Sequence, residues 1–279
     1  MRAKKSFARC AASAAVSLLA PLVLAAPAVE PTPGNDDCLT CHEDASLTAG
    51  DGRSIAVAPK EFADSVHGPM ACTDCHADLA KAEFPHAEKL ARVDCSTCHS
   101  DPVVAYGKSV HAGARTAGNK SAPNCTDCHG MHDVRSSKDK ASPTYPLNLP
   151  NMCGKCHGDA KIIKDGGIRI GDVLAKYHDS IHGKALEKSG LLVSAKCTDC
   201  HGSHEIRGKS DPEGSVFRAN IPATCGTCHG GIQALYAEGV HGSKLASGDP
   251  KVPVCSDCHS AHEIRRVDAD AWKIGRAHV

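Results

Sequence analysis

The sequence predicts an all-α fold with extensive coil, in which short helices form an elongated chain around something other than a side-chain core. Three observations lead to this expectation. Only four Phe, four Tyr and one Trp occur among 279 residues, too little bulk for an ordinary core of that length. One cysteine motif recurs eight times, about every thirty residues. Gly and Pro punctuate the chain, as in residues 142–150 and 249–253, and separate the candidate helices.

The first 28 residues are expected to be a signal peptide. Met1–Arg9 holds four basic residues and no acid, and an apolar run follows from about Ala11 to Ala26. Small residues at Ala26 and Ala28 place cleavage before Val29. An uncleaved signal anchor is the alternative, but the apolar run is short for a membrane span. We therefore expect export to the periplasm or the cell surface.

The charge of the mature chain points away from nucleic acid. Removal of the signal peptide takes away four of the 32 basic residues and leaves 28 against 32 acids, a formal charge of −4. The chain has no basic patch with interleaved aromatic residues, so nucleic acid is not an expected partner. No later stretch reaches the eighteen apolar residues of a membrane span.

Sixteen of the seventeen cysteines form eight Cys-x-x-Cys pairs, and a histidine follows each pair directly. The sites are Cys38/Cys41/His42, Cys72/Cys75/His76, Cys95/Cys98/His99, Cys125/Cys128/His129, Cys153/Cys156/His157, Cys197/Cys200/His201, Cys225/Cys228/His229 and Cys255/Cys258/His259. This is the signature of c-type haem attachment. The two thiols add to the vinyl groups of one porphyrin, and the next residue is held under the iron as its proximal ligand, where histidine offers a neutral imidazole. The sequence therefore predicts eight covalent haem c groups.

Zinc sites and disulfide bonds are the alternative interpretations of these cysteines. Two Cys-x-x-Cys pairs make a four-thiolate zinc site, and a disulfide framework fits an exported protein. Neither alternative explains why histidine follows all eight pairs.

The eight sites alternate between two kinds, so one repeat holds two haems. Four sites have an acid before the second cysteine: Asp74, Asp127, Asp199 and Asp257. A solvated acid is the simpler interpretation of these residues, with redox tuning as the alternative. The other four, called plain sites below, lack the acid. We expect four two-haem modules at residues 29–92, 93–150, 151–222 and 223–273. Residues 274–279 match one frame of a common sequencing adapter. We therefore expect them not to belong to the natural chain, which would continue past Lys273 with another sequence.

Eight further histidines occupy positions that the repeat defines. Four follow an aromatic residue by five positions in the middle of a module: His67, His111, His182 and His241. Three stand three residues after the proximal histidine of an Asp-bearing site, and module 1 has a substitute ten residues on: His132, His204, His262 and His86. Together they give every iron a second histidine ligand. A ligand three residues past a proximal histidine lies on the same face, so it must serve a neighbouring haem.

The residues around the middle histidines have two open interpretations. The aromatic residues five positions earlier either pack on a porphyrin or belong to an ordinary core: Phe62, Tyr106, Tyr177 and Tyr236. The glycine that follows three of the four middle histidines would let the backbone approach a porphyrin closely.

Two segments carry a resemblance to a known family. Cys197–Ile206 (Cys-Thr-Asp-Cys-His-Gly-Ser-His-Glu-Ile) and Ser65–Gly68 (Ser-Val-His-Gly) resemble the doubled-CxxCH multihaem cytochromes of anaerobic respiratory bacteria. The resemblance spans Asp37–Val267, although module 1 departs from the pattern after His76. It implies a periplasmic or cell-surface electron carrier. The implied donor is a membrane quinol-oxidising cytochrome, and the implied acceptor is a terminal reductase, an outer-membrane conduit or a metal oxide.

The function expected from the sequence is electron transfer through eight bis-histidine haems in anaerobic or extracellular respiration. Low potentials are expected because axial methionine, which raises the potential, is absent. No catalytic residue is expected, and the chain is not expected to be an enzyme. Two alternatives stay open: an oxyanion reductase with one open haem, and a subunit of a homo-oligomer or filament. Nitrite reductases of the multihaem kind replace one proximal histidine by lysine, whereas all eight proximal residues here are histidine.

Overall fold

The structure is a computed structural model that describes residues 32–168 and 171–266. The expected signal peptide and residues 274–279 lie outside the described residues. The chain divides into two units, Met1–Thr32 and Pro33–Val279, and every element named below belongs to the second. Within the described ranges, no helix is long and apolar enough to cross a membrane.

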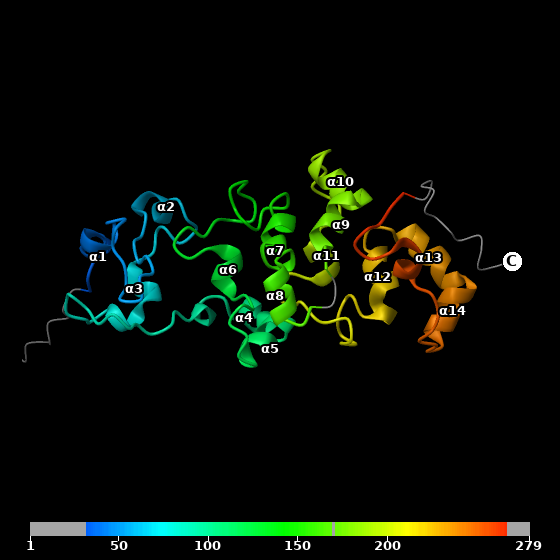
Figure 1. The fold of residues 1–279 in the computed structure, drawn as a ribbon, viewed down its shortest axis with the longest axis horizontal. Helices are drawn as coiled ribbons and strands as arrows, with labels where there is room; N and C mark the ends of the chain where they lie inside the picture. Colours follow the sequence, from blue (N-terminus) through cyan, green and yellow to red (C-terminus); the bar gives the residue numbers. More distant parts are fainter. Residues whose placement is uncertain (1–31, 169–170, 267–279) are drawn as a thin grey trace, which may run out of the picture. The chain divides into compact units, whose positions relative to one another are not determined.

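Short helices joined by coil make up the second unit (Figure 1). The α-helices are α1 (Asn35–His42), α2 (Pro59–Ala63), α3 (Cys72–Cys75), α4 (Ser100–Gly107), α5 (Val110–Thr116), α6 (Cys125–His129), α7 (Leu149–His157), α8 (Ala160–Asp165), α9 (Val173–Asp179), α10 (Ile181–Glu187), α11 (Cys197–His201), α12 (Ile221–Gly226), α13 (Gly230–Glu238), α14 (Val240–Ala246) and α15 (Cys255–His259). Three 3-10 helices are η1 (Ala77–Leu79), η2 (Cys95–Thr97) and η3 (Arg218–Asn220). Among the described residues the only bridge of β type joins Thr48 and Ser54. The prediction of an all-α, coil-rich fold is confirmed.

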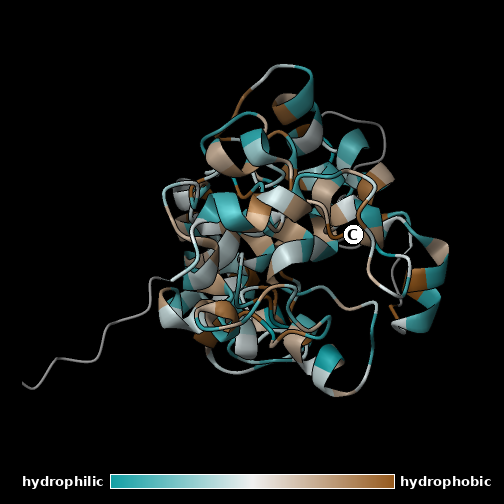
Figure 2. Ribbon diagram, turned by 90° about the vertical axis from the view of Figure 1, so that its left-hand side faces the viewer, coloured by the Kyte–Doolittle hydropathy of each residue, from teal (hydrophilic) through white to brown (hydrophobic). Residues whose placement is uncertain are grey.

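Few side chains are buried in the described part of the chain. The buried hydrophobic residues are Ala122, Leu149, Leu186, Val252 and Val254. In Figure 2 hydrophobic residues are scattered over many helices. The side chains alone therefore bury little apolar surface, as the small number of aromatic residues suggested.

The four Asp-bearing sites each form a short helix that begins at the first cysteine: α3, α6, α11 and α15. In each helix the backbone N–H of the residue before that cysteine donates to the aspartate Oδ2. The four distances are 2.8 Å at Asp74, 2.7 Å at Asp127, 2.9 Å at Asp199 and 2.7 Å at Asp257. This is the return bond of a capping box. The acids therefore cap the attachment helices, a role that neither interpretation from the sequence had included.

A side-chain hydrogen bond from elsewhere in the module holds each Asp-bearing site in place. In three modules the tyrosine hydroxyl donates to the carbonyl two residues before the first cysteine: Tyr106 to Pro123 at 2.7 Å, Tyr177 to Ala195 at 3.0 Å and Tyr236 to Pro253 at 3.0 Å. Module 1 has Phe62, which has no hydroxyl. There the Asn35 amide nitrogen donates to the equivalent carbonyl of Met70 at 3.0 Å, and its oxygen accepts from the Cys72 N–H at 2.8 Å.

The glycine after the middle histidine permits a close approach between backbone segments. A Cβ at Gly183 would lie 2.1 Å from the carbonyl oxygen of Tyr177, and one at Gly242 would lie 2.2 Å from that of Tyr236. At Gly68 the same contact is with Ala63, at 2.4 Å. The crowding comes from the end of the preceding helix or turn, whereas the sequence had suggested a porphyrin. Glycine is needed here to bring two helices together.

The capping box predicts the effect of removing one acid. Asp127→Ala removes the acceptor for the Asn124 N–H at the start of α6, and we expect it to lower the free energy of unfolding by about 1 kcal/mol. Denaturant unfolding followed by far-ultraviolet circular dichroism measures the change. Glu83→Ala, at an exposed acid in coil, is the control and should have no effect. Equal stability of the two variants would contradict the capping role.

Candidate haem-binding sites

Fourteen of the sixteen histidines that the sequence singles out meet in seven pairs. The pairs are His42–His86, His67–His99, His76–His132, His111–His157, His129–His204, His182–His229 and His201–His262. Each pair joins one proximal histidine of a CxxCH motif to one histidine of the second set. The ring centroids are 6.0 to 6.3 Å apart in every pair.

This separation fits one iron between two imidazole rings. A metal–imidazole bond of about 2 Å on each side, plus the distance from each nitrogen to the centre of its ring, puts the centroids roughly 6 Å apart. Two protein ligands are enough for a haem iron, because the porphyrin supplies the other four. Within the described residues, no three His, Cys, Asp or Glu side chains gather as a ligand set for a metal ion alone. The sixteen cysteines of the motifs are free thiols, as attachment to vinyl groups requires.

The pairs follow one register along the chain. The middle histidine of a module faces the plain site of the next module: His67 faces His99, His111 faces His157 and His182 faces His229. The histidine after an Asp-bearing site faces the Asp-bearing site of the preceding module: His132 faces His76, His204 faces His129 and His262 faces His201. Two ring pairs therefore cross each junction between modules, one in each direction.

Module 1 begins this register differently. His86 faces His42 at the plain site of its own module, with the ring planes 3° apart. The sequence had placed His86 as the substitute for the histidine after the Asp-bearing site. His76, the proximal histidine of that Asp-bearing site, instead faces His132 of module 2. His86 therefore faces the plain site of module 1. In modules 2 to 4 the middle histidine of the preceding module takes this position.

A backbone hydrogen bond crosses each junction beside the ring pairs. The donor is the N–H just before a middle histidine, and the acceptor is the carbonyl two residues after the second-set histidine of the next module. The bonds run from Val66 to Val134 at 2.9 Å, from Val110 to Ile206 at 2.9 Å and from Ile181 to Ile264 at 2.8 Å. These bonds fix the register in which the imidazoles meet.

Charged side chains flank the same bonds. Lys108 lies 3.5 Å from Glu205, and Asp179 lies 2.6 Å from Arg265. At the first junction the pKa of Asp64 is lowered mainly by Lys60 and in smaller part by Arg135 of the next module. The first and third junctions place an acid in the earlier module and an arginine in the later one, whereas the middle junction has the signs reversed. Such exposed pairs contribute only a few tenths of a kcal/mol each.

Within a module, the first cysteines of the two sites lie near enough for one thiol to shift the pKa of the other. The pairs are Cys38 with Cys72, Cys95 with Cys125, Cys153 with Cys197 and Cys225 with Cys255. Burial, together with the neighbouring Cys38 thiol, raises the pKa of Cys72 to about 11. The attachment points of the two sites of one module are therefore side by side.

Between modules, the second cysteines lie near each other. The pKa of Cys75 is raised by burial, then by Asp74, then by the charge of Cys98 in the next module. At the other two junctions the pKa values of Cys128 and Cys200 are likewise raised first by burial and then by the adjacent aspartate. The second cysteine of the next module contributes less: Cys156 to the shift of Cys128, and Cys228 to that of Cys200. First-cysteine and second-cysteine contacts therefore alternate from module 1 to module 4.

Six of the sixteen attachment cysteines are exposed, among them Cys41 of the first site and Cys258 of the last. Their part in haem attachment stays a prediction from the CxxCH spacing.

Exposure is shared by four more attachment cysteines. These are Cys75, Cys98, Cys125 and Cys228. Each of them nevertheless lies near a cysteine of a neighbouring site. An accessible sulfur suits a residue that must reach a porphyrin vinyl group, so the exposed thiols agree with covalent attachment.

Most of the paired imidazoles are kept in the neutral form that binds a metal. Burial lowers the pKa of eight of them: His76, His111, His129, His132, His157, His182, His201 and His262. The His42 Nδ1–H donates to the Ile55 carbonyl at 2.9 Å, which leaves Nε2 for the iron. Burial thus disfavours the imidazolium, which has no free lone pair.

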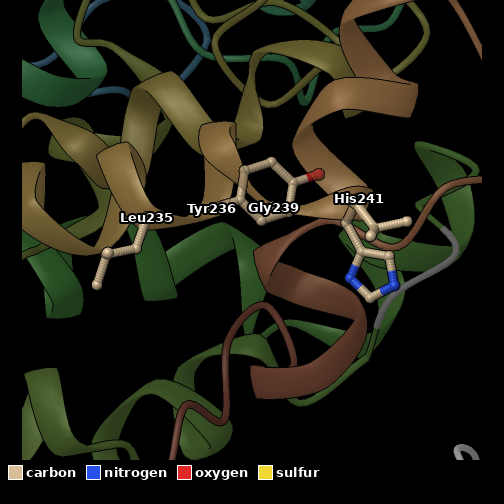
Figure 3. Close-up of a pocket in the computed structure, with 5 residues that line it drawn as sticks. Leu235, Tyr236, Gly239 and His241 are labelled. Carbon is tan, nitrogen blue, oxygen red and sulfur yellow. The ribbon is translucent and has the colours of Figure 1, made fainter.

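The two remaining site histidines lie in module 4. His259 ends α15, and His241 lies in the first turn of α14. His241 lines a hollow of about 530 Å³ with Leu235, Tyr236, Gly239 and Val240 (Figure 3). Neither histidine belongs to the seven pairs above. His178, which is not one of the sixteen site histidines, lies 2.5 Å from the Glu187 carboxylate.

Comparisons with known proteins agree with this site. Residues 66–161 match a family described as cytochrome c3, and residues 190–234 match the doubled CXXCH motif. The high-molecular-weight cytochrome c of Nitratidesulfovibrio vulgaris (strain Hildenborough) is 24% identical over 211 residues, which are 69% of this chain and 31% of that protein. The chain thus spans about a third of the length of this relative. No solved structure matches the chain.

The motifs, the helical coil-rich fold and these matches together support one class, the multihaem c-type cytochromes. The CxxCH motif is the one through which proteins of this class attach haem c covalently. The particular likeness of the chain is to cytochrome c3 in the segment 66–161 and to the doubled-CXXCH proteins in the segment 190–234.

The backbone bonds between modules can be tested one at a time with proline. Val110 is the first residue of α5, a position that suits proline, and Ser109 before it is extended, as a residue before proline must be. Val110→Pro therefore removes only the N–H that donates to Ile206. We expect the free energy of unfolding to fall by about 1 kcal/mol, as measured by denaturant unfolding.

Val240→Pro is the matched control. Val240 is the first residue of α14 and follows an extended Gly239, but its N–H donates to no carbonyl among the described residues. We expect stability to be unchanged or slightly raised, because proline restricts the unfolded chain. Equal losses in the two variants would mean that proline disturbs the helix start itself, and would contradict the importance of the inter-module bond.

Proposed function

We propose that the chain conducts electrons along a row of eight haem c groups that follow one another in sequence order. The observation that carries this proposal is the alternation of cysteine contacts, first with first inside a module and second with second between modules. Each attachment site then has the attachment site of the next haem beside it. Haem c supplies an iron that cycles between Fe(III) and Fe(II). The protein's part is to keep successive sites close, since tunnelling rates fall steeply with distance.

The seven ring pairs are the proposed axial ligand pairs. Both ligands are histidine in each, so the proposed potentials are low, because the upward shift given by axial methionine is absent. Ligands taken from a neighbouring module would tie adjacent haems to one another as well as to the chain. At these seven sites a second histidine faces the proximal one, which supports a carrier over a reductase with an open iron face.

The proposed setting is the periplasm or the cell surface, in anaerobic or extracellular respiration. The signal-like N-terminus and the resemblance to doubled-CxxCH cytochromes support it. The proposed donor is a membrane cytochrome that oxidises quinol. The proposed acceptor is a terminal reductase, an outer-membrane conduit or a metal oxide.

Removing one second-set histidine should open a haem in another module. His204 lies in module 3 but faces His129 of module 2, with ring centroids 6.0 Å apart. In the haem-loaded protein, His204→Ala is expected to convert one low-spin ferric haem per chain to high-spin. Electron paramagnetic resonance, integrated against total haem, measures the conversion. His178→Ala, at a histidine placed against Glu187, is the control and should leave the spectrum unchanged.

A second variant locates the opened haem. Cys125→Ser with Cys128→Ser removes the attachment site that carries His129. In that background His204→Ala should produce no further high-spin signal, because its haem is gone. A high-spin signal that persists would mean that His204 serves a haem of its own module, and would refute the proposed register.

A further inference from the structure

The capping aspartates of the four Asp-bearing sites differ in whether a cation accompanies them. Asp74 and Asp127, in modules 1 and 2, accept their cap bonds but form no ion pair within the described residues. In module 3 the Lys196 Nζ lies 2.7 Å from the Asp199 Oδ2, and the Lys196 side chain is only 15% exposed. The negative charge of the cap is therefore balanced in module 3 and unbalanced in modules 1 and 2.

In module 4 the cap is accompanied by an arginine that comes from the end of module 3. One terminal nitrogen of Arg218 lies 2.7 Å from the Asp257 Oδ2, and the other lies 3.1 Å from the Oδ1, so the two side chains meet in a bidentate pair. The same guanidinium donates to the carbonyls of Pro250 and Val252, at 3.0 and 2.7 Å. Its hydrogen bonds therefore hold the positive charge against this Asp-bearing site.

Neither cation belongs to the repeat itself. The residue directly before the first cysteine of an Asp-bearing site is Lys196 in module 3, whereas the other modules have an uncharged residue there: Ala71, Asn124 and Val254. Seven residues before the first cysteine of a plain site stands Arg218 ahead of module 4, but Glu88 ahead of module 2 and Pro146 ahead of module 3. The repeat folds without either cation, so each is an addition at one site.

A charge beside a haem changes its reduction potential. Each capping aspartate directly precedes the second cysteine of its motif, whose sulfur joins the porphyrin in the proposed haem-loaded protein. Ferric haem carries one more positive charge than ferrous haem, so a nearby carboxylate favours the ferric state and lowers the potential. A cation beside the carboxylate offsets this effect. The ring pairs give no such difference between modules 1 and 3, because two histidines meet at the Asp-bearing site of each.

We propose that Lys196 and Arg218 raise the reduction potentials of the haems at the Asp-bearing sites of modules 3 and 4, and so direct electrons towards these two modules. The inference rests on the proposed electron transfer and gives the row of haems a direction. Lys196 acts on the haem of the α11 motif, and Arg218 acts on the haem of the α15 motif. An electron that leaves a ferrous haem in module 2 and reduces a ferric haem in module 3 then moves to a higher potential.

Charge-changing substitutions in module 4 provide the first test. In the haem-loaded protein, Arg218→Gln should lower the potential of the haem of the α15 motif, and Asp257→Asn should raise it. The asparagine oxygen can still accept the Val254 N–H, which donates to Asp257 at 2.7 Å. Together the two changes leave this pair without net charge, as it is now, so the double variant should return to the original potential.

Spectroelectrochemical titration measures these potentials. The difference between titrations with and without the pair of changes Cys255→Ser and Cys258→Ser isolates the haem of the α15 motif. A purely structural role for Arg218 would give a change that Asp257→Asn does not reverse, because that substitution removes a second partner. An unchanged potential in Arg218→Gln, or a double variant that stays displaced, would overturn the inference.

The cation of module 3 can be copied into module 2 as a second test. Asn124 occupies the position of Lys196, so Asn124→Lys should raise the potential of the haem of the α6 motif, and the rise should shrink at high salt. Asn124→Val is the matched control, because valine stands at this position in module 4. Both changes remove the Asn124 oxygen that accepts the Thr126 N–H at 2.8 Å. Equal potentials in the two variants would overturn the inference.

The haem count separates the two ways in which this account can fail. By haem assay, the variant with Cys255→Ser and Cys258→Ser should carry one haem fewer than the original chain. If no haem is lost, the proposed function fails and the inference fails with it. If one haem is lost but the potentials do not respond to Arg218→Gln or Asn124→Lys, the inference alone is overturned.

Discussion

The meeting of two imidazole rings from different modules, at a separation that fits one iron, is the interaction on which the rest of the molecule depends. Six of the seven pairs cross a junction, and only His42–His86 lies within a module. The described chain buries few apolar side chains, so a side-chain core of ordinary size cannot hold the modules together. Metal ligation that joins distant residues contributes directly to folding free energy. Under the proposed function, these ligands take the place that a core has in other folds.

The remaining interactions serve to aim these ligands. Aspartates cap the attachment helices, and tyrosine hydroxyls, or Asn35 in module 1, hold the segment that leads into each Asp-bearing site. Glycine lets the helix that carries a middle histidine approach the end of the preceding helix. The backbone bond one residue before that histidine then sets the register with the next module. Each contact is weak, but all of them act on the position of one imidazole.

The sequence predicted the helical, coil-rich fold and the histidines that the structure brings together, because motif spacing and recurrence are visible in one dimension. The expectation that the histidines after the Asp-bearing sites serve neighbouring sites also agrees with their placement. Which site each middle histidine faces was not predictable. The tripeptide Ser-Val-His is the same in modules 1 and 2 and carries no information about the site that its histidine faces. His86 could not be assigned for the same reason. The capping role of Asp127 was missed, although an N-cap Asn124 three residues earlier is a recognisable signal.

The most direct measurement of the central claim is a crystal structure of the haem-loaded protein with anomalous diffraction at the iron edge. The account predicts eight irons in sequence order. Seven of them should lie between the paired rings, so that the iron bound through Cys125 and Cys128 has His129 on one side and His204 of the next module on the other. An iron held there by two histidines of module 2, or irons that depart from sequence order, would contradict it.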